Sequence, residues 1–79
     1  MVTVRLFGPA RDLFGAPSCV LDATALDVLR DELAARGGPS FAALLARSAL
    51  WVNGEPAGAS LALAAGDEVA VLPPVSGGC

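Results

Sequence analysis

The sequence predicts an α+β fold: a mixed sheet of four to five strands, one main helix packed across it, and a short second helix. Apolar and polar residues alternate near the N-terminus, and a short apolar run stands near the C-terminus, so strands are expected at both ends. Between them, leucines recur at spacings of three and four residues, which indicates a helix with one buried face. A chain of 79 residues allows one domain.

The first two strands are expected to form a hairpin. Apolar and polar positions alternate over Val2–Phe7, which predicts the first strand, and Gly8-Pro9 ends it. Ala10–Phe14 is long enough for one short helical turn. Ser18–Asp22 is predicted as the second strand, so the hairpin connection is long.

The main helix is predicted over Ala25–Arg36. Thr24 is expected to cap its N-terminus, with Asp27 completing an approximate capping box. Gly37-Gly38-Pro39 is expected to supply a left-handed cap and a stop. The buried face is expected to be a leucine stripe widened by one valine: Leu26, Val28, Leu29 and Leu33.

The rest of the domain is expected to complete the sheet. Ser40 is expected to cap a shorter helix over Phe41–Arg47. A strand over Leu50–Asn53 is followed by the tight-turn pair Asn53-Gly54. Glu55–Ser60 is read as a loop or a short edge strand, and residues 64–67 as another turn.

The last strand is predicted over Glu68–Leu72. Its apolar run favours a central strand covered on both faces, and Pro73-Pro74 stops it, because proline donates no ladder hydrogen bond. The order of elements is that of the β-grasp layout, with the first and last strands parallel at the sheet centre. Residues 1–74 are therefore predicted to form the domain, and 75–79 an exposed, mobile tail.

Composition excludes several functions. The net charge is −3 and the five basic residues are all arginine, which disfavours binding to nucleic acid or to a membrane surface. Two cysteines and no histidine provide neither a disulfide framework, nor an ordinary metal site, nor a nucleophile–base pair. No secretion signal and no bilayer-spanning run is recognised, so a cytoplasmic protein is expected. No bound cofactor is expected either.

The C-terminal segment has the composition of an acyl carrier. Glycine has no side chain, so Gly77-Gly78 suits a narrow enzyme channel, and Val75–Gly78 can extend roughly 13 Å at about 3.3 Å per residue. A glycine carboxylate is unhindered but a poor electrophile. Adenylation by an ATP-using partner would convert it to a mixed anhydride, from which a persulfide sulfur could displace AMP to leave a thiocarboxylate.

The whole chain resembles the ThiS/MoaD sulfur carriers, which have a ubiquitin-like fold, and within them most closely the small subunit of molybdopterin synthase. The most specific block is Gly66–Gly78, and its Pro73-Pro74 favours the molybdopterin branch over the thiamin branch. The resemblance also rests on the opening block Val2–Gly8 with Ala10-Arg11-Asp12, on the helix that begins at Thr24, and on Val52-Asn53-Gly54.

The resemblance implies a carrier that acts with partner enzymes and is not itself an enzyme. An E1-like adenylyltransferase of the MoeB/ThiF type would use ATP and a persulfide source to load Gly78. Gly77, which has no side chain, would let the tail pass through a narrow channel to the active site. The thiocarboxylate would then donate sulfur inside the large molybdopterin synthase subunit. Six residues are assigned to partner binding: Phe7, Leu72, Pro73, Pro74, Val75 and Ser76.

Cys79 departs from the family pattern, because it locks the Gly78 carboxyl in an amide. Three hypotheses account for it: a metal-dependent peptidase removes Cys79, the residue is an engineered handle, or its thiol itself takes part. Peptidase removal is preferred. Some carriers in natural-product sulfur pathways have a similar short extension after Gly-Gly, which a metal-dependent peptidase trims.

Other functions remain open at this point. A carrier for another thiolation pathway (natural product, thiamin or cysteine) fits Cys79. A ubiquitin-like modifier joined to lysines through Gly78, and a protein-interaction module with an incidental tail, are the alternatives from other classes. Arg11 is interpreted as a surface arginine, with pairing to an acidic partner as the second hypothesis, and Trp51 as a core or edge-strand aromatic.

Overall fold

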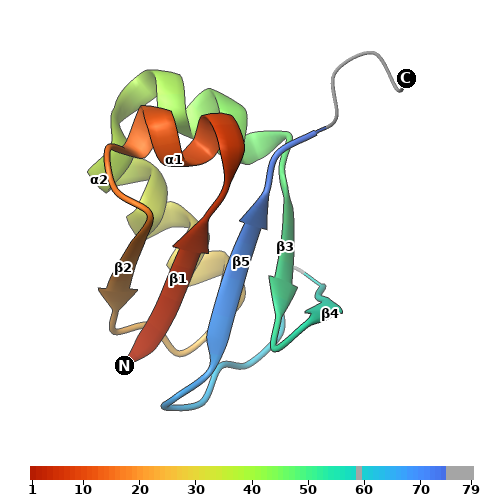
Figure 1. Ribbon diagram of the computed structural model, residues 1–79. Helices are drawn as coiled ribbons and strands as arrows, with labels where there is room; N and C mark the ends of the chain where they lie inside the picture. The colour runs from red at the N-terminus through yellow and green to blue at the C-terminus, as the bar shows by residue number, and fades with distance from the viewer. Residues whose placement is uncertain (59, 75–79) are drawn as a thin grey trace.

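A computed structural model describes residues 1–58 and 60–74 of the chain. Within them the elements follow the predicted order (Figure 1). The short helix α1 begins at Gly8, before the predicted start at Ala10, because Pro9 is tolerated in the first helical turn. The elements are β1 (Val2–Leu6), α1 (Gly8–Phe14), β2 (Ser18–Leu21), α2 (Leu26–Ala46), β3 (Ala49–Val52), β4 (Glu55–Pro56) and β5 (Glu68–Leu72).

The strands form one sheet in the order β2-β1-β5-β3-β4. The first and last strands, β1 and β5, are parallel neighbours at its centre, with Val4 opposite Val69. The other pairs are antiparallel: β1 with β2, β5 with β3, and β3 with β4. Figure 1 shows both helices on one side of this sheet. The arrangement confirms the predicted β-grasp fold.

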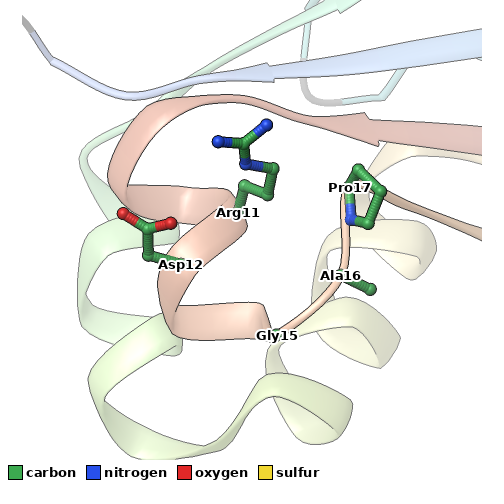
Figure 2. Close-up of a pocket in the computed structure, with 5 residues that line it drawn as sticks. All are labelled: Arg11, Asp12, Gly15, Ala16 and Pro17. Atoms are coloured by element: carbon green, nitrogen blue, oxygen red, sulfur yellow. The ribbon is translucent and has the colours of Figure 1, made fainter.

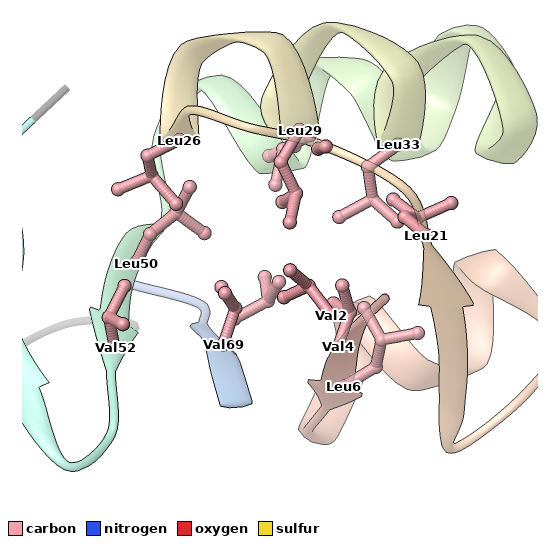
Figure 3. Close-up of a cluster of buried hydrophobic side chains, with 14 of the residues drawn as sticks. Val2, Val4, Leu6, Leu21, Leu26, Leu29, Leu33, Leu50, Val52 and Val69 are labelled. Carbon is pink, nitrogen blue, oxygen red and sulfur yellow. The ribbon is translucent and has the colours of Figure 1, made fainter. Parts of the chain in front are cut away.

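The core lies between the sheet and α2. Figure 3 shows Leu26, Leu29 and Leu33 of α2 facing the inward side chains of the strands. Phe41 closes the cluster beside α1, where its ring packs against Phe14 with centroids 5.1 Å apart. The fully buried side chains of largest volume are Phe41, Leu21, Leu26, Leu29, Leu33, Leu45, Val2, Val4, Val69 and Val71. Their burial supplies the main stabilising free energy of a domain this small.

Coverage of β5 on both faces was a wrong prediction. Val69 and Val71 are buried against the helices, whereas Ala70 and Leu72 are only half-buried on the other face. The apolar run reflects two different surroundings. One face belongs to the core, and the second, described below, is an open sheet surface.

The predicted cap at Thr24 is also wrong. The capping position is Ala25, and no side chain caps the helix. Instead, Ala25 pairs with Ala62 in an isolated bridge, and the Leu26 N–H donates to the Leu61 carbonyl at 2.9 Å. A distant loop thus satisfies the N–H group that a local cap would otherwise bind. Asp27 accepts a hydrogen bond from the Val28 N–H, within the first turn.

The two predicted helices of the middle segment join as α2. Helical geometry is interrupted at Gly38, with φ 86° and ψ 176°, next to Pro39, so the predicted stop is present as a kink. The positive φ suits glycine, but the extended ψ differs from the left-handed cap that was expected. Val28 does not belong to the buried stripe, because its side chain is 49% exposed.

We expect Gly37→Ala to destabilise the domain. A methyl group at residue 37 would overlap the fully buried ring of Phe41. Overpacking of this kind costs about 1–3 kcal/mol in the free energy of unfolding. Urea denaturation measures the loss, with Gly58→Ala as a matched control, since a methyl group there meets no atom within 4 Å. Equal stability of the two variants would contradict the packing described.

In the part of the chain that the structure describes, no helix is long and apolar enough to cross a membrane.

Candidate functional site

Two of the predicted partner-binding residues lie where the central strands end. Leu6 of β1 pairs with Val71 of β5, so Phe7 and Leu72 follow them at the same end of the sheet. Strand side chains alternate between faces, and Leu6 and Val71 are buried under the helices. Phe7 and Leu72 therefore lie on the opposite, open face. Phe7 is 46% exposed and Leu72 is half-buried.

These two residues continue into a larger apolar surface. We name it the open-face patch and define it as Phe7, Ala49, Trp51, Ala70 and Leu72. Leu72 stands opposite Ala49, and Ala70 opposite Trp51, in the β3–β5 ladder. Trp51 is half-buried on the open face of an interior strand, so it is neither a core nor an edge-strand aromatic. The register of β3 against β5 is what places it there, and no local sequence signal specifies that register.

An ion pair lies on the same open face, further toward the start of β5. The Arg5 Nε donates to the Glu68 carboxylate at 2.7 Å, and both side chains are about half exposed. The hydrogen bond that Arg5 donates to this carboxylate, more than the charge of the carboxylate, raises the pKa of Arg5. The open-face patch is thus flanked by a charged pair, as the polar rim flanks the apolar centre of many protein interfaces.

Side-chain hydrogen bonds fix the start of β5, at the other end of the strand. The Asn53 Nδ2 donates to Asp67 at 3.1 Å, and the Asn53 Oδ1 accepts from the Glu68 N–H at 3.0 Å. Asp67 also accepts from the Ala64 N–H at 2.8 Å, and this bond, followed by that from Asn53, lowers its pKa. Asn53 and Gly54 have φ of 51° and 83°, which confirms the predicted tight turn. These contacts hold the strand that leads to the C-terminal segment.

The chain beyond β5 carries the remaining predicted site residues. Pro73 is half-buried and Pro74 exposed, at the end of the sheet where Phe7 lies. The predicted carrier residues Gly77 and Gly78, together with Val75, Ser76 and Cys79, lie outside the described residues, as does the whole predicted tail.

Arg11 lines a shallow hollow of about 400 Å³ between α1 and the start of β2, together with Asp12, Gly15, Ala16 and Pro17. Figure 2 shows the guanidinium between Asp12 on one side and Pro17 on the other. Arg11 is exposed, as the surface interpretation requires. Within residues 1–58 and 60–74, no three His, Cys, Asp or Glu side chains come close enough together to hold a metal ion.

The parallel central strands and the helices on one face of the sheet define a ubiquitin-like β-grasp protein. In the sequence, Gly77-Gly78 follows the last strand after four residues. The chain belongs to the ThiS family, whose pattern it matches over residues 4–78. It is thus a ThiS/MoaD-type ubiquitin-fold sulfur carrier or modifier. The resemblance implied the carrier, and the modifier was the alternative. Members of this kind are small carrier proteins or subunits.

Solved structures agree with this assignment. SAMP1 from Haloferax volcanii is 28% identical, with a TM-score of 0.80 and 98% of each chain covered. A chain in the complex of molybdopterin-converting factor subunits 1 and 2 from Helicobacter pylori is 29% identical, with a TM-score of 0.73 and coverage of 98% of this chain and 97% of that one. A chain in the BexX/CysO complex from Amycolatopsis orientalis shares the fold, at 24% identity, TM-score 0.80, and 99% and 100% coverage. No curated protein sequence matches the chain.

Proposed function

We propose that the chain is a sulfur carrier that acts as the small subunit of molybdopterin synthase, with Gly78 as the residue that bears the sulfur. The observation that carries this proposal is the course of β5. This central strand is held at its start by the Asn53–Asp67 contacts and ends at the apolar Leu72, at the same end of the sheet as Phe7. Four residues after its end, the sequence reaches Gly77-Gly78.

The proposed loading proceeds in two displacements followed by a reduction. The Gly78 carboxylate attacks the α-phosphorus of ATP on an E1-like adenylyltransferase, pyrophosphate leaves, and an acyl adenylate forms. A persulfide sulfur then attacks the acyl carbon and AMP leaves. A thiol reduces the resulting acyl disulfide, which leaves the thiocarboxylate. The carrier supplies the acyl group and the docking surface, and its partner enzymes supply the catalysis.

Cys79 is proposed to be removed before loading, by a metal-dependent peptidase. An amide-bound carboxyl is a weak nucleophile toward ATP, so the acyl adenylate requires a free Gly78 carboxylate. With Cys79 attached, the chain is a precursor. Transfer of the sulfur is then proposed to take place in the large molybdopterin synthase subunit. The chain's likeness to a component of the Helicobacter pylori complex supports this choice of acceptor.

A second candidate function is protein modification, favoured by the 28% identity to SAMP1 over 98% of each chain, since the same Haloferax volcanii protein is described as a small archaeal modifier. In that function the activated Gly78 acyl group would pass to a lysine of a target protein. The two functions share adenylation and differ in the group that attacks the adenylate.

Intact mass spectrometry separates these functions. Incubation with the peptidase is expected to remove the mass of one cysteine residue. Adenylyltransferase, ATP and a persulfide donor should then raise the mass by the difference between one sulfur and one oxygen atom. Conjugates with target lysines and no thiocarboxylate would favour the modifier. An active carrier that keeps Cys79 throughout would contradict the precursor hypothesis.

A further inference from the structure

The two edges of the sheet differ in how they are protected from pairing with another strand. The β4 edge has only two residues, Glu55 and Pro56. It is therefore short, Glu55 gives it a charge, and Pro56 has no backbone N–H to donate. These are the devices by which proteins block edge strands. The β2 edge, Ser18–Leu21, has four residues with neither charge nor proline. Among the described residues, β2 is the outermost strand on this side of the sheet (Figure 1).

The register identifies the backbone groups that face outward from β2. The Leu6 N–H donates to the Pro17 carbonyl at 2.9 Å, whereas the Thr3 N–H donates toward β5, to the Asp67 carbonyl. Backbone groups alternate in direction along a strand, so the Val4–Cys19 pair is bonded within the sheet. Ser18 and Val20 therefore direct their N–H and C=O groups to the open edge. The Val20 side chain is also 51% exposed.

This edge is complementary to a second copy of itself. In an antiparallel pair related by a two-fold axis, Ser18 of one copy stands opposite Val20 of the other, and each such pair exchanges both backbone hydrogen bonds. Cys19 then lies on the axis, opposite its counterpart. No charged residue of β2 faces a like charge across the axis, because the strand has none.

The ends of the paired strands bring no like charges together. The same register places Asp22, exposed just after β2, opposite Ala16 of the other copy. Ala16 carries no charge, so Asp22 meets no like charge across the axis.

We propose that the chain forms a symmetric dimer through β2, in which two sheets join edge to edge with Cys19 at the two-fold axis. The open-face patch of each copy lies toward β5 and β3, away from the joined edges, so both copies keep it accessible. The interface is small, and a dissociation constant between about 10 μM and 1 mM is expected.

Disulfide trapping tests the register. Cys79→Ser leaves Cys19 as the only thiol of the chain. Residues opposite each other in a non-hydrogen-bonded antiparallel pair have Cα atoms about 4.5 Å apart, which lies within the range of disulfides. With oxidised glutathione, two Cys19 thiols should give one disulfide, as two electrons and two protons pass to glutathione. Burial raises the pKa of the Cys19 thiol, so the exchange is run at alkaline pH.

Val20→Lys on this background tests the interface. It places two ammonium groups diagonally across the axis and should weaken dimerisation at least about tenfold and reduce the disulfide yield in proportion. Val28→Lys on α2 is the matched control, because Val28 is 49% exposed, and it should dimerise normally. Equal dimerisation of the two lysine variants would overturn the proposal.

Amide hydrogen exchange can be measured on the protein without any substitution in β2, so this test does not depend on the folding of a variant. The amides of Ser18 and Val20 should gain protection as the protein concentration rises through the dissociation constant. Light scattering that shows a monomer up to about 1 mM would overturn the dimer. Protection that appears only with an added strand-forming peptide would assign the edge to a foreign strand and overturn it equally.

Discussion

A chain shortened by one residue, so that it ends at Gly78, is expected to be adenylated and sulfurated without any peptidase. The full chain is expected to stay unmodified under the same conditions. The reason is chemical: adenylation needs a carboxylate, and Cys79 converts the Gly78 carboxyl to an amide. Release of pyrophosphate and intact mass report the two steps separately.

A chain that ends at Gly77 sharpens this test. It also ends in a free glycine carboxylate, but the reactive carbon lies about 3.3 Å short of its place in the activating enzyme. Since misplacement by about 1 Å can cost a hundredfold in rate, adenylation should fall by at least about that factor. Cys79→Ser should be as inert as the full chain. Sulfur loading of a chain that retains residue 79 would contradict the proposed carrier.

Phe7→Asp is expected to abolish most binding to the E1-like adenylyltransferase while leaving the fold intact. Phe7 is 46% exposed in the open-face patch, and a buried apolar anchor of an interface contributes at least about 2 kcal/mol, which is roughly thirtyfold in affinity. A carboxylate there would also have to be desolvated on docking.

The fold should tolerate this change for a reason specific to the site. Phe7 occupies the capping position of α1 with φ −125° and ψ 152°, and its side chain caps nothing. Aspartate is among the preferred residues at that position, so α1 loses no capping interaction. Val28→Asp, on the helical side of the domain and 49% exposed, is the control. Calorimetric titration that shows equal affinities for the two variants would exclude the open-face patch as the docking surface.

The regular elements could be predicted because their signals are local. Alternation gave β1, the leucine spacing gave the buried face of α2, and Asn53-Gly54 gave the turn between β3 and β4. The parallel pairing of β1 and β5 followed from the order of elements, since a β-grasp chain brings its first and last strands together. The family assignment rested on the same blocks of sequence.

The errors have a common cause in contacts between distant segments. Thr24 has a good capping residue type, but the Leu61 carbonyl already accepts the Leu26 N–H. Val28 has the right spacing for the stripe, yet it lies outside the contact between α2 and the sheet. The apolar run of β5 suggested two covered faces, because composition does not distinguish a second core layer from an open interaction surface.

The sequence by itself determined the elements, the β-grasp order and the Gly-Gly end with its additional cysteine, because each depends on residues adjacent in the chain. Only the tertiary structure decided which surfaces the domain presents. The register of β3 against β5 places Trp51 beside Ala70 on the open face, and the sheet order leaves β2 at an edge. Register and strand order depend on packing between residues far apart in sequence, so no local pattern specifies them.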